Sequence, residues 1–139
     1  MPVSLTKSPR DFSVLMQYGT VHGVLLTPDT EEERDHLRLA IGYAYCVDIC
    51  EVIAVDRYEA AIRAIAIHDR EAAIEDYMAS TRTGYRAARA LYRDCRTWAR
   101  ALTPEGRASW LADGPKSYAP LKRFALVEAM REFGETTSA

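Results

Sequence analysis

Several features that would identify a function are scarce or missing in this sequence. Three cysteines among 139 residues are too few, and odd in number, for a secreted disulfide framework. The seven glycines are dispersed, which excludes a glycine-rich phosphate-binding loop. The first ten residues hold no basic segment that leads into an apolar run, so no signal peptide is predicted. The longest apolar run, Leu39 to Val55, contains Asp48 and Glu51 and is not expected to span a membrane. We therefore predict a cytoplasmic protein.

Recognisable catalytic motifs are also missing. Ser80, Ser109 and Ser117 stand in neither a Gly-x-Ser-x-Gly nor a Ser-x-x-Lys context. His68 with Asp69 and Glu71 has the composition of a general-base group, but a helix break with a capping aspartate explains the same residues. No motif is specific enough to indicate a family. The sequence predicts that the protein is not an enzyme.

Two groups have the spacing of metal ligands. Cys46 and Cys50 lie one helical turn apart, but a tetrahedral site usually needs four ligands, and small core residues are the simpler interpretation. Glu33 and His36 match the Glu-x-x-His unit of di-iron bundles, which need two such units. No second unit exists, and Glu33 fits a capping role at a solvated helix start. We predict no metal and no cofactor.

Helix signals follow one another along most of the chain. In the first half, helices are expected from Ser8 to Gly19 and from either Thr27-Pro28 or Thr30 to about Val55, with a bend or restart at Asp56 and Glu59. Residues 20–26 fit either a short strand or a buried connection. The apolar phase changes between Ile62 and Ile74, which predicts a break near residues 68–69.

The second half shows clearer boundaries. A joint is expected at Ser80 to Gly84, then helices over residues 83–102 and 103–112, and a last helix that stops at Gly134. Length and an apolar content of 48% suit one globular domain. The predicted fold is all-α: a compact bundle of six or seven helices in a single domain over residues 1–139, with residues 135–139 as a flexible tail.

Charge is distributed unevenly along the chain. Residues 28–76 contain 13 acids and 5 arginines, whereas residues 77–123 contain 10 bases and 3 acids. The basic half holds six arginines spaced alternately by four and three residues. On an α-helix they lie within about 40° of one line and form a ridge about 27 Å long. We call this set the arginine row: Arg82, Arg86, Arg89, Arg93, Arg96 and Arg100.

The arginine row predicts a negatively charged partner, because neighbouring like charges repel. The acid can belong to the acidic half of the same chain, to a second copy, or to another protein, since arginine pairs bidentately with carboxylates. Nucleic acid is the alternative, with Tyr85 and Tyr92 beside the row as candidates for base stacking. Our leading hypothesis is a protein-interaction module, an adaptor, inhibitor or regulatory subunit, that forms homo-oligomers. The alternative hypothesis is a nucleic-acid-binding regulator, and an enzyme or a small-ligand-binding bundle comes third.

A second interface is predicted within the apolar segment that precedes residue 56. If that segment is one regular helix, five of its residues share a face. One of the five is an aspartate, whose carboxylate needs either an arginine partner or contact with solvent on this otherwise apolar face. This face is interpreted either as a partner seam or as a surface paired inside the monomer. Its residues are Ile41, Tyr45, Asp48, Val52 and Val55.

Overall fold

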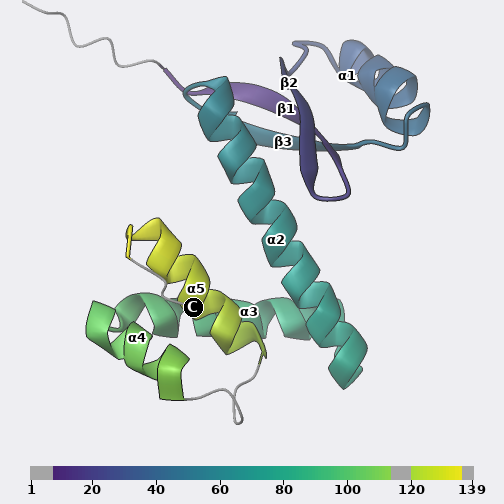
Figure 1. Cartoon of the computed structure of the whole chain (residues 1–139). Helices are drawn as coiled ribbons and strands as arrows, with labels where there is room; N and C mark the ends of the chain where they lie inside the picture. The colour runs from purple at the N-terminus through teal and green to yellow at the C-terminus, as the bar shows by residue number, and fades with distance from the viewer. Residues whose placement is uncertain (1–7, 114–119, 136–139) are drawn as a thin grey trace, which may run out of the picture. The chain divides into compact units, whose positions relative to one another are not determined.

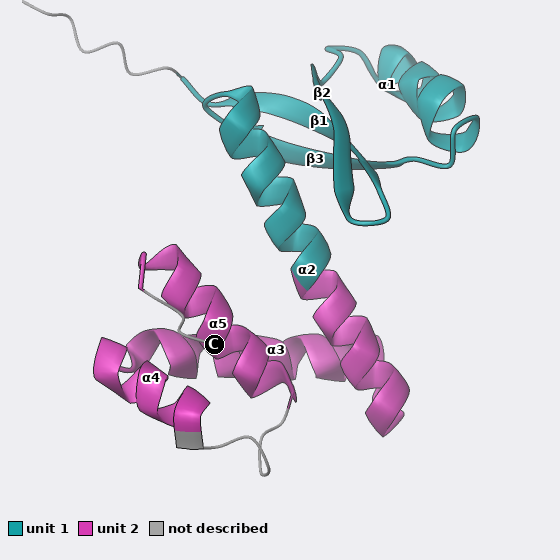
Figure 2. Cartoon of the chain, in the orientation of Figure 1, with its two compact units in different colours: residues 1–69 teal, residues 70–139 magenta. Residues whose placement is uncertain are grey.

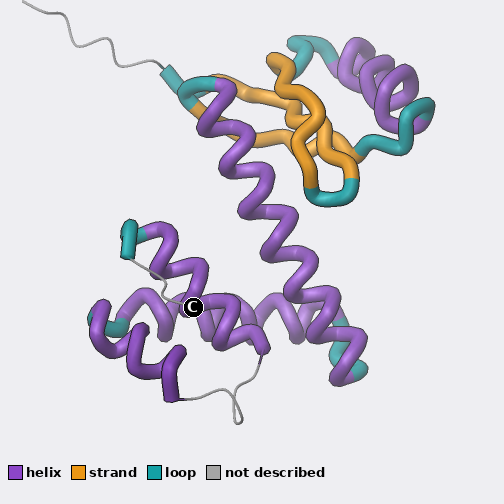
Figure 3. The backbone as a smooth tube through the Cα atoms, viewed as in Figure 1, coloured by secondary structure: helices purple, strands orange, loops and turns teal. Residues whose placement is uncertain are grey.

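The computed structural model describes residues 8–113 and 120–135 and is a mixed α/β fold (Figure 1). The described residues form three strands, five α-helices and one π-helix. The prediction of an all-α bundle of six or seven helices is therefore wrong. The three strands, orange in Figure 3, all precede residue 55. They take the place of the first predicted helix and of the end of the second.

The sheet has three antiparallel strands in the order β2-β1-β3. Strand β1 spans Arg10–Gln17, β2 spans Thr20–Leu26 and β3 spans Asp48–Ala54. Strands β1 and β2 form a hairpin whose two-residue turn, Tyr18-Gly19, has positive φ at both positions (51° and 77°). These angles fit a type I′ turn, the connection whose twist matches that of the paired strands.

The segment predicted as the first helix forms β1, because a period of two fits its apolar residues as well as a helical period does. Phe12, Val14 and Met16 alternate along β1 and are all buried. They form the core of this region with Val52 and Ala54 of β3 and with two small residues of helix α2 (Arg57–Thr81), Ala60 and Ala64. For residues 20–26 the sequence left two alternatives, a short strand or a buried connection. These residues form strand β2.

The segment predicted as a helix to Val55 divides into a short helix, a π-helix and a strand. Helix α1 spans Glu31–Leu37 and is capped by Thr30, whose hydroxyl accepts a hydrogen bond from the Glu33 N–H. This is the second of the two starts that the sequence left open. Helix α1 continues as the π-helix η1, Arg38–Tyr43. The chain then turns at Cys46, which has a φ of 54°, and enters β3. A run that is apolar on all sides fits a strand as well as a buried helix.

Helix α2 spans Arg57–Thr81 without interruption. One half of the predicted capping box is present, since the Glu59 N–H donates to the Asp56 carboxylate (2.8 Å). The Glu59 carboxylate accepts from the Val55 N–H (3.5 Å) and not from the Asp56 N–H, which a complete box requires. The predicted break near residues 68–69 is wrong. The apolar phase changes there because Ile62 and Ile65 are exposed while Ile74 is buried.

The last three helices follow the predicted boundaries closely. Helix α3 spans Tyr85–Ala101, α4 spans Pro104–Asp113 and α5 spans Pro120–Glu132. After α5, the N–H groups of Gly134 and Glu135 donate to the carbonyls of Arg131 and Met130, the pattern of a Schellman motif. The buried residues of these helices form a second core with Ile74 of α2: Ala88, Tyr92, Cys95, Ala99, Leu121, Ala125, Leu126 and Ala129.

The chain divides into two compact units, residues 1–69 and residues 70–139, with the boundary inside α2 (Figure 2). Unit 1 contains 6 Lys and Arg against 11 Asp and Glu, a net charge of −5. Unit 2 contains 12 Lys and Arg against 9 Asp and Glu, a net charge of +3. The predicted single domain concerns how the two units fold together, and it stays a prediction.

The start of the predicted tail has a contact. Arg107 of α4 is buried and donates hydrogen bonds to the carbonyls of Ala99 (3.2 Å) and Leu102, at the end of α3. Its guanidinium also pairs with Glu135 (Nε to Oε2, 2.9 Å), and this hydrogen bond lowers the pKa of the Glu135 carboxyl. Residues 136–139 of the predicted tail lie outside the described residues.

Candidate protein interface on helix α3

Helix α3 carries five of the six residues of the arginine row. Arg82 instead lies in the joint between α2 and α3, with a φ of 58°. The helical alignment therefore begins at Arg86 rather than at Arg82. Because Arg82 is exposed and lies close to the start of α3, it adds positive charge near that end of the row.

The buried side of α3 determines which way the arginines point. Ala88, Tyr92, Cys95 and Ala99 are buried in the core of unit 2, where α3 packs against α5. All four lie within an arc of about 60° around the helix. Since they occupy one side of the helix, the arginines lie on its flank and on its solvent side.

The arginines on the flank are paired within unit 2. Arg89 lies 3.6 Å from the carboxylate of Glu71 and also donates to the Tyr85 hydroxyl (2.8 Å), which donates to Glu71 (2.9 Å). Arg96 (3.5 Å) and Arg100 both pair with Glu132. Glutamates of the same unit therefore supply part of the negative charge that the arginine row was predicted to need.

Arg86 and Arg93 differ from the flank arginines in having no ion pair among the described residues. Both are exposed. On an α-helix they lie about 130° to 150° from the centre of the buried face, whereas Arg89 and Arg96 lie about 70° to 90° from it. The two are seven residues apart, so they align within about 20° and are separated by about 10.5 Å along the axis. We call Arg86 and Arg93 the outer arginines.

The exposed residues between and beside the outer arginines are small, so the helix surface around these two side chains projects little into solvent. Ala90 lies between the two along the helix, and Thr97 is exposed about one turn beyond Arg93 on the same side. Asp94, the only acid of α3, lies about 100° around the helix from the outer arginines. A partner can therefore approach the α3 backbone closely while its carboxylates reach both guanidinium groups.

A polar network under α3 holds the helix in place. Arg70 of α2 donates to the Glu128 carboxylate of α5 through Nη2 (3.2 Å) and Nε (3.4 Å), and the buried Tyr92 hydroxyl donates to the same carboxylate. Burial, followed by the hydrogen bond to Glu128, raises the pKa of Tyr92 to about 12. Tyr92 is thus buried in the core with its hydroxyl hydrogen-bonded, so its ring cannot stack on a nucleic-acid base.

The predicted second interface loses its geometric basis. Ile41 is part of η1, Tyr45 lies in the following connection, and Asp48 and Val52 belong to β3. Val55 follows that strand. Val52 is buried in the core of unit 1, whereas Tyr45 is exposed. These five residues share no helix face, because the helix that would align them does not form.

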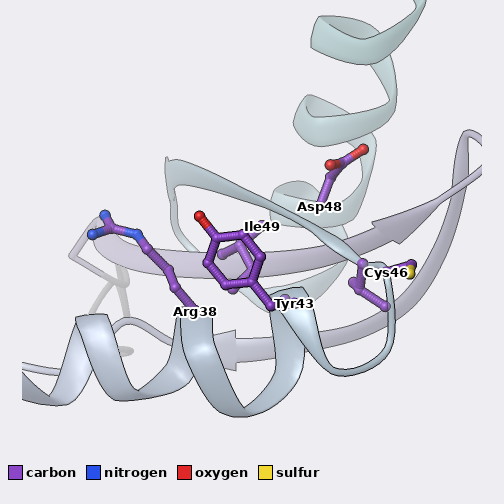
Figure 4. A pocket seen from close by; sticks show the side chains of 7 residues that line it. Arg38, Tyr43, Cys46, Asp48 and Ile49 are labelled. Carbon is purple, nitrogen blue, oxygen red and sulfur yellow. The ribbon is translucent and has the colours of Figure 1, made fainter.

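A pocket that the sequence did not indicate lies between η1 and the start of β3 (Figure 4). Its volume is about 440 Å³. In Figure 4, Arg38 and Tyr43 rise from the helix, Cys46 lies in the connection and Asp48 begins the strand. Arg38 already pairs with Asp35 (3.0 Å) and Glu51 (3.3 Å), which reduces its capacity to bind an anion. A π-helix is frequent at functional sites, but no simple sequence signal marks one.

The groups with metal-ligand spacing do not assemble into sites in the part of the chain that the structure describes. Cys46 is exposed in a turn while Cys50 lies in β3, so the helical spacing of the two thiols is absent. Glu33 and His36 are both exposed on α1. No cluster of three or more His, Cys, Asp or Glu side chains suited to a metal ion occurs among residues 8–113 and 120–135.

Comparisons with known proteins do not assign a function. No family model matches this chain, and neither the curated proteins nor the solved structures include a similar one. Across the described residues, every helix is too short or too polar to cross a membrane. Within unit 2, the outer arginines are the most distinct exposed feature.

Proposed function

We propose that this protein is a cytoplasmic, non-enzymatic interaction module that binds an acidic surface of another protein through helix α3. The outer arginines, Arg86 and Arg93, make the central contacts. The rest of the arginine row supplies positive potential around them. What supports the proposal is the division of the row: Glu71 and Glu132 pair with the flank arginines, and the outer pair stays exposed without an ion pair among the described residues.

Carboxylates are the chemistry that fits this surface best. A guanidinium presents a planar fork of N–H donors that matches a carboxylate in bidentate geometry. Two such forks about 10.5 Å apart match acids spaced two helical turns apart on a partner helix. The small residue Ala90, between the two arginines, allows that partner to pack closely.

Nucleic acid fits the same surface less well. Binding to a phosphate backbone gains affinity from each phosphate that is neutralised, and three arginines of the row are already paired with glutamates. Tyr92 is buried and unable to stack on a base. The net charge of the whole chain, −2, also opposes binding to a polyanion.

The experiment is affinity capture with the full chain as bait, from nuclease-treated lysate of the source cells. The test variant is R86E/R93E, and the matched control is R123E/R131E, which makes the same charge change at two exposed arginines of α5. A protein that the wild type and the control retain, and that R86E/R93E loses, supports the proposal. Equal retention by R86E/R93E contradicts it, provided that circular dichroism shows this variant to be folded.

Mobility-shift assays with a DNA duplex and with single-stranded RNA test the alternative partner. We expect no shift at physiological salt. A shift whose logarithmic affinity falls steeply with the logarithm of salt concentration, and which R86E/R93E removes, would favour the nucleic-acid hypothesis instead.

A further inference from the structure

Helix α2 exposes a line of large apolar side chains on the side that faces away from the sheet. Tyr58 is 77% exposed, Ile62 49% and Ile65 39%. We call these three residues the α2 stripe. All belong to unit 1, whose core contacts with α2 are made by Ala60 and Ala64. On an α-helix the stripe lies roughly opposite those alanines, so the core of unit 1 does not account for it.

The spacing of the stripe is that of a helix-pairing seam. Its members are separated by four and then three residues, the alternation that keeps one narrow line facing a partner helix. Two isoleucines and a tyrosine that stay in water forgo a stabilisation of roughly 25 cal/mol for each Å² of apolar surface that a partner would cover. The flanking residues Ala61 and Ala66 are small enough for a second helix to approach closely.

The stripe is complementary to itself when two copies of α2 run antiparallel. With the two-fold axis between positions 63 and 64, Ile62 of each copy faces Ile65 of the other, and Tyr58 faces Asp69. The phenol then donates to a carboxylate at each end of an isoleucine centre. Arg63 is turned away from the seam and pairs with Glu59 of its own helix (2.6 Å). A parallel pair would place the two Asp69 carboxylates against each other, which is unfavourable.

We propose that unit 1 is a dimerisation unit, in which the α2 stripe pairs antiparallel with the same stripe of a second copy. The contact involves about three helical turns on each side, so its area is at the small end of the range for specific interfaces. The dimer therefore dissociates on dilution. The stripe and the outer arginines belong to different units, so dimerisation and binding of an acidic partner are separate properties.

Sedimentation equilibrium of the full chain over a wide concentration range tests the proposal. The wild type is expected to shift from monomer to dimer as concentration rises, whereas I62E/I65E stays monomeric because like charges face each other across the seam. The matched control is L25E/I53E, which adds the same charges at sheet residues of similar exposure (38% and 60%). The control is expected to dimerise like the wild type.

A second variant tests the antiparallel register. In I62E/I65K, the acid at position 62 faces the base at position 65 of the other copy, so dimerisation is expected to recover relative to I62E/I65E. In a parallel pair the same variant would place like charges opposite each other and would not recover. A monomeric wild type at every concentration, or a folded I62E/I65K that stays monomeric, would overturn the proposal. Loss of helical circular dichroism in I62E/I65E would show that the stripe belongs to the fold, and would overturn it too.

Discussion

At the scale of single residues, Glu128 is the point on which the polar contacts inside unit 2 converge. Its side chain is 10% exposed and accepts hydrogen bonds from Arg70 and Tyr92. Glu128→Ala leaves a partly buried guanidinium and a buried hydroxyl without their shared partner. We expect the free energy of unfolding to fall by about 3 kcal/mol, measured by urea denaturation.

The control for this prediction is Glu75→Ala. Glu75 is exposed on α2 and has no ion pair within the described residues, so its removal is expected to change stability by less than about 0.5 kcal/mol. Similar effects of the two substitutions would show that the network around Glu128 adds little to stability.

Tyr92 makes stability depend on pH in the alkaline range. The pKa of a tyrosine in an unfolded chain is about 10, and burial with the Glu128 hydrogen bond raises that of Tyr92 to about 12 in the folded protein. The folded state therefore holds the proton more tightly. The contribution of the protonated Tyr92 to the free energy of unfolding is fully present below pH about 10 and is lost as the pH rises through about 12.

Tyr92→Phe cannot ionise, so its stability is expected to decline less over this range. The measurement is the difference in melting temperature between the wild type and Y92F at several values between pH 9 and 12. This difference should shrink as pH rises. A difference that stays constant would mean that the Tyr92 pKa is the same in the folded and unfolded states.

Gly19 is required by the hairpin turn for two reasons. Its φ of 77° is unfavourable for any residue with a Cβ, and a Cβ there would lie 3.0 Å from Cε1 of His68. We expect Gly19→Ala to lower stability by about 1 to 2 kcal/mol from the backbone conformation alone. The double variant G19A/H68A should recover only the part that comes from the close contact.

Gly23→Ala, in the same hairpin, serves as the control. A Cβ at Gly23 would meet Leu15 at 3.5 Å, an ordinary contact, and its φ is not in the left-handed region. Thermal unfolding of the variants compares the two positions. Equal losses at Gly19 and Gly23 would contradict the role assigned to the turn.

At the scale of elements, the Asp56 side chain caps the start of α2. Asp56 accepts the N–H of Glu59, and Glu59 reaches back toward the N–H of Val55. Asp56→Ala is expected to cost about 1 kcal/mol, as is usual for the loss of an N-cap, with unfolding followed by circular dichroism at 222 nm. Asp76→Ala changes an exposed acid in the interior of the same helix and should have little effect. A loss as large at Asp76 would contradict the capping role.

Elements with local signals at both ends were predictable from the sequence. Helix α3 was expected over residues 83–102 and spans Tyr85–Ala101, because a weak joint precedes it and its arginines and apolar residues keep one phase. Helix α5 ends at Glu132, just before Gly134, because glycine adopts the left-handed conformation that closes the helix there.

The sheet was not predictable in the same way, because its signals are nonlocal. Phe12, Leu15 and Met16 fit a helical period, while Phe12, Val14 and Met16 fit the period of a strand. The choice is decided by pairing with β2 and with β3, which lies more than thirty residues further along the chain. Pairing over that distance leaves no mark in a short window of sequence.

The apolar phase does change within α2, but the helix break predicted from this change is wrong. A change of apolar phase normally indicates a helix break, on the assumption that all large apolar residues face the core. Ile62 and Ile65 instead give α2 a second apolar side. For the candidate interface, the row of arginines was predictable, but its division was not, since Glu71 and Glu132 lie in other helices.

At the scale of the whole molecule, one helix belongs to both cores. Residues 57–69 of α2 contribute Ala60 and Ala64 to unit 1, and residues 70–81 contribute Ile74 to unit 2. If a helix is continuous and cooperative, unfolding of one half exposes the end of the other. If the prediction of a single domain is correct, a substitution that destabilises one core also lowers the stability of the other.

The distribution of tryptophan makes this testable, because Trp98 and Trp110 both belong to unit 2. Val14→Ala removes two methyl groups from a fully buried site in unit 1 and should lower the free energy of unfolding by about 2 kcal/mol. In a single cooperative domain, the urea midpoint of tryptophan fluorescence falls together with that of circular dichroism. Leu126→Ala, in the core of unit 2, lowers the fluorescence midpoint in either case and serves as the positive control. A fluorescence midpoint that V14A leaves unchanged, while circular dichroism becomes biphasic, would show that the two units unfold independently.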